Sequence, residues 1–300
     1  METQVRFPRW QGLSAVLLVL VGAGSTMTMA AQPSVTVVRT EFRVSRSDGS
    51  VMAQAELPGT VLTLADGTGG TVRIRIDRVE RDGKTAGAIT LYALSRFDVA
   101  NAEWKPFCKQ ASDGSQLAFP LRGVWTADGR HLPANERFEI ACTSDAIGEC
   151  VRAGYHPWQT RPDGTSLWDY HQACVRMLRA DYCGDGRPAS RDEAAIDMYD
   201  RLGIQRSEAG VDFSFEAAWG PNGAVCVARS RIPKLASLAA LLSACPNKLR
   251  GRVGVACSEE SSPALGDALL FNKSRIPDAA AAGQPDAVAR HAVSLPFDQF

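Results

Sequence analysis

Eight cysteines constrain this chain more than any other feature of its sequence. None precedes residue 108, and no two of them form a Cys-x-x-Cys pair: they are Cys108, Cys142, Cys150, Cys174, Cys183, Cys226, Cys245 and Cys257. An even number of cysteines without that pair indicates a disulfide framework rather than a zinc ribbon or a thioredoxin-type redox motif. Because eight cysteines permit about a hundred pairings, the sequence leaves the connectivity open.

The first 31 residues have the three-part pattern of a secretory signal peptide. Arg6 and Arg9 supply positive charge, residues 13–24 are apolar, and small residues surround Ala30. The apolar run is shorter than the roughly 20 residues that span a bilayer, and no later segment is apolar enough. We therefore expect a signal peptide over 1–31, an extracytoplasmic protein (periplasmic or secreted), and no membrane span after cleavage.

Charge and motif content exclude several functional classes. The chain carries 33 Lys and Arg against 33 Asp and Glu, a balance that argues against a generally basic nucleic-acid binder. It has no Gly-x-Ser-x-Gly elbow, no His-Glu-x-x-His zinc motif and no phosphate-binding loop. We expect no cofactor and no nucleic-acid partner.

Residues 32–142 have the pattern of antiparallel strands. Within Thr71–Glu80, Val72, Ile74 and Ile76 alternate with charged residues, which predicts a strand with one buried face. Further strands are predicted over Thr60–Ala65, Ala86–Arg96, Phe119–Trp125 and Phe138–Cys142, separated by turns rich in Gly and Asp.

Residues 143–257 mix helix and strand patterns. Helices are predicted over Leu167–Ala180, Arg191–Tyr199 and Lys234–Ala244, and a hairpin over Val211–Ala217 and Ala224–Arg229 around an Asn-Gly turn. Residues 258–300 are rich in Ser, Pro and Ala and are expected to be a loosely packed tail. The fold class is therefore α+β, with an antiparallel β-rich half followed by a disulfide-rich mixed half.

The segment Ala180-Asp181-Tyr182-Cys183, after a helix and before Gly-Asp-Gly, resembles the motif that names the bacterial ADYC-domain family. Stretches 147–158, 196–205 and 215–232 also resemble that family, in the same order along the chain. The resemblance covers about 60–250, with the cysteine-rich core at 143–257. It implies an exported bacterial protein with no assigned reaction, and it transfers no catalytic residues.

Two histidines invite a catalytic interpretation. His171 and Cys174 lie three residues apart on the predicted helix, so the imidazole faces the same side as the thiol. A disulfide at Cys174, to Cys183 or another partner, is the favoured alternative, and the same holds for Cys150 with His156. A His–carboxylate site remains, in which His171 acts with Asp169 or Asp181.

The loop after the helix also has part of a calcium-binding spacing. Asp181, Asp185 and Asp192 fall at positions one, five and twelve of a twelve-residue loop with Gly186 at position six. Cys183 takes position three, where an oxygen ligand belongs, so these are weak candidates and we expect no metal site.

Aromatic residues concentrate in 155–182, beside Asp169 and Asp181. Core packing is the favoured interpretation, and a sugar-binding platform is the alternative. The leading hypothesis is an exported, disulfide-stabilised, non-catalytic module that binds a glycan or an envelope protein. The alternative is a hydrolase of an envelope polymer with a His/Asp site near 169–185.

Overall fold

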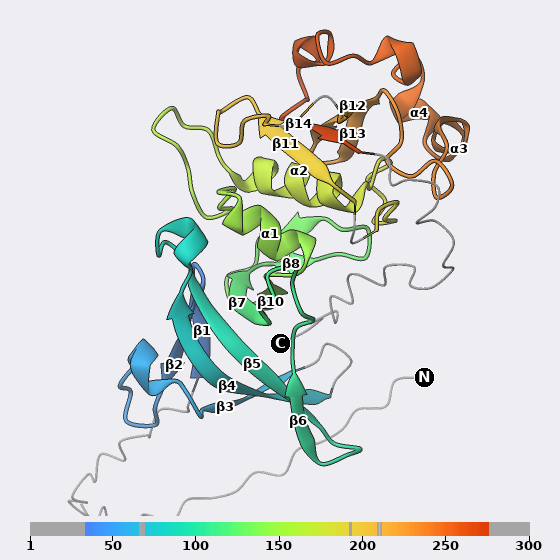
Figure 1. Ribbon diagram of the computed structural model, residues 1–300. Helices are drawn as coiled ribbons and strands as arrows, with labels where there is room; N and C mark the ends of the chain where they lie inside the picture. Colours follow the sequence, from blue (N-terminus) through green and yellow to red (C-terminus); the bar gives the residue numbers. More distant parts are fainter. Residues whose placement is uncertain (1–33, 66–69, 192–193, 209, 211, 276–300) are drawn as a thin grey trace, which may run out of the picture.

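The computed structural model describes residues 34–275, except 66–69, 192–193, 209 and 211. The predicted signal peptide over 1–31 and most of the predicted tail therefore lie outside the described residues. Figure 1 shows a curved sheet from the first half at the bottom, two helices in the middle, and a second sheet above them.

The first half consists of short antiparallel strands: β1 (Ser34–Val38), β2 (Glu41–Ser45), β3 (Val61–Ala65), β4 (Thr71–Arg81), β5 (Thr90–Asp98), β6 (Glu103–Pro106), β7 (Leu117–Arg122), β8 (Val124–Trp125), β9 (His131–Leu132) and β10 (Phe138–Cys142). A six-stranded sheet has the order β10-β7-β5-β4-β3, with β6 paired to the end of β5. β1 with β2, and β8 with β9, form two separate ribbons. The antiparallel β-rich half that the sequence predicted is confirmed.

The second half holds the main helices and the second sheet: α1 (Ala146–Arg152), α2 (Trp168–Arg179), β11 (Ile196–Asp200), β12 (Ser214–Gly220), β13 (Gly223–Val227), α3 (Leu238–Ala244), α4 (Pro246–Leu249) and β14 (Leu270–Ser274). The sheet has the order β11-β14-β12-β13, and every pairing in it is antiparallel. The α+β class is therefore confirmed.

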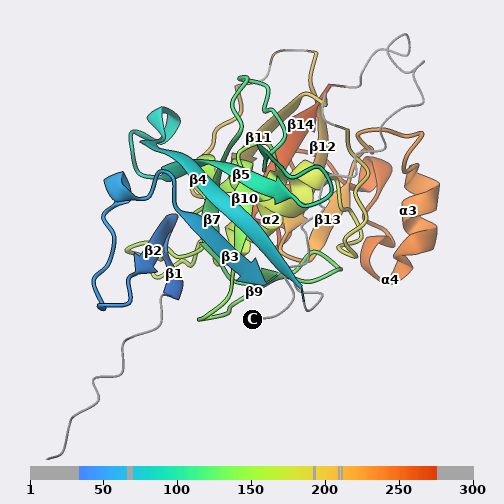
Figure 2. The same ribbon diagram turned by 90° about the horizontal axis from the view of Figure 1, so that it is seen from below.

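Helix α2 is the centre of the molecule. It packs against β12, β13 and β14 on one side and against α1 on another, which explains why most of its residues are buried. Figure 2 shows the strands of the first sheet crossing in front of this helix when the molecule is seen from below. One cluster of buried side chains runs from Val37 in β1 to Leu270 in β14, so both halves contribute to it.

Strand β4 shows how the sequence pattern becomes a sheet face. Ile74 and Ile76 are fully buried, whereas Arg73 is exposed and Arg75 half-buried on the opposite face. The register pairs Ile74 with Leu62 of β3 and Ile76 with Leu94 of β5, so the apolar side chains gather on one side. Alternation with a period of two thus fixes which face meets the core.

Two elements of the second half differ from the sequence-based prediction. The helix predicted over Arg191–Tyr199 is wrong, because Ile196–Asp200 forms strand β11. Its alternating Ile196 and Met198 pair with β14, which is far away in sequence, and such pairing overrides weak local helix propensity. The helix expected over Lys234–Ala244 starts only at Leu238, where the Ser237 hydroxyl accepts a hydrogen bond from the Ala240 N–H at 3.1 Å.

Part of the predicted tail is well packed. β14 lies between β11 and β12, and Leu270 and Asn272 in it are fully buried. The expectation of loose packing over 258–300 is therefore wrong for residues 270–274. This strand could not be predicted from the sequence pattern, because it has few apolar residues and its partner strands precede it by fifty residues or more.

All eight cysteines form disulfides, so the predicted framework is confirmed. The pairs are Cys108–Cys142, Cys150–Cys174, Cys183–Cys245 and Cys226–Cys257. The first lies within the β-rich half and the second joins α1 to α2. Four disulfides indicate an oxidising, extracytoplasmic environment. Within the described residues, no helix has the length and apolar content to cross a bilayer.

Candidate functional site

The motif Ala180–Cys183 begins where α2 ends. Ala180 has left-handed backbone angles, φ 51° and ψ 41°, and its N–H donates back to the helix. This conformation terminates the helix and turns the chain into the loop that follows. Each of the next three residues then makes a contact of its own, and the first two of them are buried.

Asp181 organises the loop. Its side chain is almost completely buried. One carboxylate oxygen accepts hydrogen bonds from the N–H groups of Gly184 and Asp185 at 2.9 and 3.1 Å, and the other accepts from Gly186 at 3.0 Å. Arg176 of α2 forms an ion pair with the same carboxylate. The loop and the helix therefore use the acceptor capacity of Asp181.

Tyr182 connects the motif to the second sheet. Its hydroxyl donates to Glu216 of β12 at 3.0 Å and accepts from the backbone N–H of Arg231 at 2.7 Å. Its ring stacks on Trp219 with 5.2 Å between the ring centroids. Burial raises the pKa of the Tyr182 hydroxyl well above its ordinary value, so the group remains a hydrogen-bond donor.

Arg231 and Glu216, both in contact with the Tyr182 hydroxyl, form a fully buried ion pair. Two guanidinium nitrogens of Arg231 each lie 3.0 Å from a carboxylate oxygen of Glu216. The guanidinium also donates to the carbonyl oxygens of Met177 and Leu178, at 2.7 and 2.8 Å, and to the Ser190 hydroxyl at 2.8 Å. These carbonyls belong to the last turn of α2, where a cation is favoured by the helix dipole.

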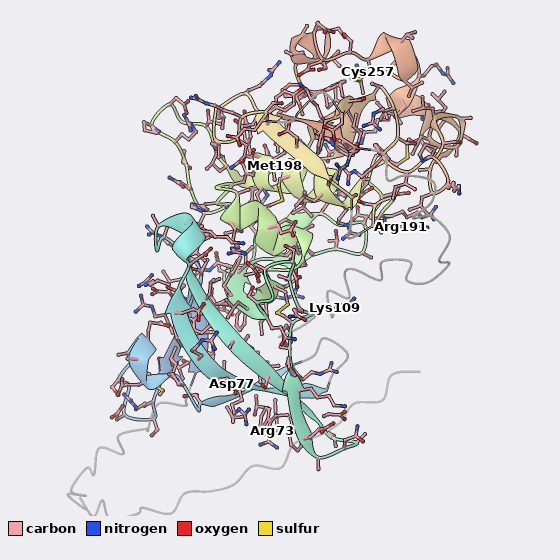
Figure 3. The ribbon with its side chains drawn as sticks, in the orientation of Figure 1. Arg73, Asp77, Lys109, Arg191, Met198 and Cys257 are labelled. Carbon is pink, nitrogen blue, oxygen red and sulfur yellow. A yellow bond between two sulfur atoms is a disulfide. The ribbon has the colours of Figure 1, made fainter. Side chains whose placement is uncertain are left out.

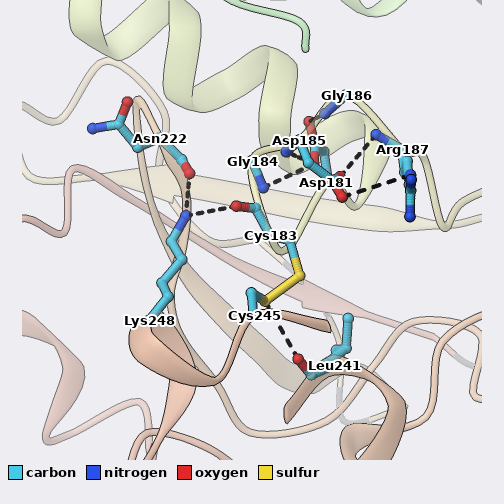
Figure 4. Close-up of a disulfide and its surroundings, with 10 residues drawn as sticks. All are labelled: Asp181, Cys183, Gly184, Asp185, Gly186, Arg187, Asn222, Leu241, Cys245 and Lys248. Carbon is cyan, nitrogen blue, oxygen red and sulfur yellow. Dashed lines mark hydrogen bonds and ion pairs between the residues drawn. A yellow bond between two sulfur atoms is a disulfide. The ribbon is translucent and has the colours of Figure 1, made fainter. Parts of the chain in front are cut away.

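Cys183 completes the motif through its disulfide with Cys245 (Figure 4). Lys248 donates from Nζ to the carbonyl oxygens of Cys183, at 3.2 Å, and of Asn222. Burial lowers the pKa of the Lys248 ammonium to about 8. Gly184 has a φ of +73° and packs so closely on the Asn222 carbonyl that a side chain has no room there. The loop is thus held by its disulfide to Cys245, by the hydrogen bond from Lys248 and by the close contact of Gly184 with Asn222.

The weak calcium candidates do not converge. Asp181 is occupied by N–H groups and Arg176, Asp185 is exposed at the loop surface, and Asp192 lies outside the described residues. Among the residues that the structure describes, no group of three His, Cys, Asp or Glu side chains is placed to hold a metal ion.

The catalytic candidates are also separated. His171 is fully buried, with Nε2 lying 3.2 Å from the Ile147 carbonyl oxygen. Asp169 is exposed on the same helix, and Asp181 is engaged with Arg176. Cys174, the proposed thiol neighbour of His171, is bonded to Cys150. The structure therefore brings no carboxylate among these candidates to the buried imidazole.

An aromatic stack that the sequence did not reveal lies beside His171. His131 lies between Trp125 and Trp168, 3.8 Å from each ring centroid, and its ring is 5.8 Å from that of His171. Trp125 and His131 are placed opposite each other by the β8–β9 pairing. In the sequence, the Asp-Gly turn between Trp125 and His131 was the only feature that indicated this pairing. Burial lowers the pKa of His131 to about 3 and that of His171 to about 4.

Acid is therefore expected to destabilise the fold through these two histidines. A lowered folded-state pKa means that the unfolded chain binds more protons, so this stability is complete above about pH 6.5 and declines as the pH falls toward 4 and 3. Between pH 7 and pH 5 we expect a loss of about 2 kcal/mol per histidine. Urea unfolding at both pH values tests this, and His171→Gln should remove about half of the difference. An unchanged free energy of unfolding in the wild type would contradict it.

Two open pockets in the described part of the chain have volumes of several hundred cubic ångströms. One, of about 650 Å³, is lined by Val35, Thr63, Leu64 and residues 134–138. The other, of about 430 Å³, is lined by residues 196–198 and 203–206 and by Glu208. Neither contains His171, Asp169 or Asp181.

The motif region is therefore an internal scaffold, and comparison with known proteins identifies it. No curated protein and no solved structure matches the chain. The family model for the ADYC domain matches residues 54–233, a span that includes the six-stranded sheet, α2, the motif and the Glu216–Arg231 pair. The chain belongs to the ADYC domain family.

Proposed function

We propose that the chain is an exported, non-catalytic module that serves a binding or structural role at the bacterial envelope. One observation carries this proposal. The polar groups of the motif, Asp181 and Tyr182, are directed into the protein, where they hold α2 to the second sheet through Glu216 and Arg231. Residues used in this way stabilise a scaffold and are not available to a substrate.

Two features support the proposed location. All four disulfides are formed, which fits an oxidising compartment, and residues 1–31 have the pattern of a signal peptide. We infer a periplasmic or secreted protein whose partner is a glycan or an envelope protein. The competing hypothesis is a hydrolase of an envelope polymer that uses His171 with Asp169 or Asp181.

Sedimentation with isolated bacterial envelopes tests the two hypotheses together. We expect the mature chain to sediment with the envelopes and to release no soluble sugar or peptide fragments from them. Treating the envelopes with trypsin beforehand distinguishes the partners, because binding to a glycan survives it and binding to a protein does not. A chain that stays in the supernatant contradicts the binding role.

The variant Asp169→Asn is the matched control. Asp169 is exposed in the first turn of α2, so the variant should fold and sediment like the wild type. Fragments that are released by the wild type and are absent with Asp169→Asn would establish the hydrolase instead.

A further inference from the structure

The outer face of the first sheet presents an ordered set of arginine and aromatic side chains. The register aligns Thr63 of β3 with Arg73 of β4, and Phe97 of β5 with Trp104 of β6. Since Ile74 pairs with Arg96, Arg73 lies beside Phe97, and the four residues form one row across the sheet. Figure 3 shows Arg73 and Asp77 on the side of this sheet that faces away from the helices.

Aromatic rings hold Arg73 of this row and the neighbouring Arg75. The Cζ atom of Arg73 lies 4.6 Å from the Phe97 ring centroid and 5.4 Å from that of Trp104. Arg75, two residues along β4, lies 4.8 Å from the Trp104 centroid. The two aromatic rings meet edge to face at 5.2 Å. Guanidinium groups held on rings lose little freedom when they bind a ligand, because their orientation is already set.

The positive charge of this face is only partly neutralised. Arg75 directs its Nε–H to Asp77 at 2.5 Å, and Asp77 also accepts from Ser95. Arg73 is exposed and forms no ion pair with any residue that the structure describes. Its planar N–H groups therefore match a carboxylate, which binds a guanidinium through two parallel hydrogen bonds.

The arrangement of this face favours a polymer with repeated carboxylates over other anionic partners. A polymer with repeated carboxylates gains from Arg73 and Arg75 together, because the two guanidinium groups lie over adjacent aromatic rings. β4 and β5 are paired on both edges, so an acidic peptide cannot add as a strand beside either of them.

We propose that Arg73, Arg75, Phe97 and Trp104 form a binding site for an acidic polysaccharide. The guanidinium groups pair with its carboxylates, and the edges of the two aromatic rings pack against its sugar rings. This inference rests on the proposed binding role at the envelope and names the surface and the class of ligand for it.

Calorimetric titration with polygalacturonate, a polymer of carboxylated sugars, tests the site. We expect binding that weakens as the salt concentration rises and is absent with neutral dextran. Arg73→Gln should lower the affinity at least tenfold, and Arg73→Lys should also lower it, because lysine keeps the charge and loses the planar fork. Arg78→Gln is the matched control: it removes one exposed arginine of β4 that pairs with Glu80 outside the row.

The outcomes separate this inference from the broader proposal. Equal affinity in wild type and Arg73→Gln, or tighter binding of poly-glutamate or phosphatidylglycerol vesicles, would overturn the assigned site or ligand. If Arg73→Gln still sediments with envelopes as the wild type does, the binding role stands and this surface is excluded. If the wild type binds neither envelopes nor polygalacturonate, both proposals fail.

Discussion

Replacing Arg231 with methionine is expected to lower the free energy of unfolding by about 3–5 kcal/mol. The substitution leaves the Glu216 carboxylate fully buried, with the Tyr182 hydroxyl at 3.0 Å as its remaining hydrogen-bond donor. It also removes the donor to the last carbonyl groups of α2. Since domains are stable by only about 5–15 kcal/mol, this is the largest single-residue effect that we expect. Urea unfolding monitored by circular dichroism measures it.

Arg187→Met is the control for this prediction. The Arg187 side chain is 88% exposed and lies in the loop that follows the motif, so its replacement should change stability by less than about 0.5 kcal/mol. If Arg231→Met fails to fold, Tyr182→Phe gives a milder test, because it deletes one hydroxyl from the same network at a cost of about 1–2 kcal/mol. Equal stabilities of Arg231→Met and Arg187→Met would show that the buried pair is not a structural anchor.

The double variant Arg231→Met with Glu216→Leu separates charge from packing. If the cost arises from an uncompensated buried carboxylate, removing that carboxylate as well should recover a large part of the lost stability. If the cost arises from lost contacts with the end of α2, the double variant should be at least as unstable as the single one. The first outcome is the one we expect.

Local patterns predicted those elements whose signals lie within a few residues. Helix α2 follows the apolar spacing of Leu167–Ala180 closely, and β10 coincides with the predicted Phe138–Cys142. The β12–β13 hairpin forms around the Asn-Gly turn as expected. Strands β11 and β14 were missed because each is defined by a distant partner, and a short strand without that partner has no distinctive pattern.

The candidate site was harder to predict, for the same reason. The resemblance to a family motif drew attention to Asp181 and Tyr182. No spacing in the sequence indicated that Tyr182 would bind Glu216, 34 residues later, or that Arg231 would donate to carbonyl groups of α2. Likewise His171 seemed a catalytic candidate because sequence shows neither its burial nor its carbonyl partner. The row of Arg73, Phe97 and Trp104 arises only when three strands are aligned.

The second large effect is expected at the disulfide between Cys183 and Cys245. It closes a loop of 62 residues, the longest of the four, and loop-closure entropy then stabilises the fold by about 4 kcal/mol. The double variant Cys183→Ala with Cys245→Ala should lose about that amount, which corresponds to roughly 10 °C in melting temperature. Differential scanning calorimetry of both proteins under non-reducing conditions provides the measurement.

This disulfide should also be the first to be reduced by dithiothreitol. Both of its cysteines are only half-buried, whereas Cys150 and Cys174 are fully buried. A thiolate must reach a sulfur atom to exchange with it, so access determines the order of reduction in the folded protein. Alkylation at intervals followed by peptide mass mapping should find Cys183 and Cys245 labelled before the other six cysteines. Earlier labelling of Cys150 and Cys174 would mean that the helices open before the motif loop does. The loop would then be the more stable part of the scaffold.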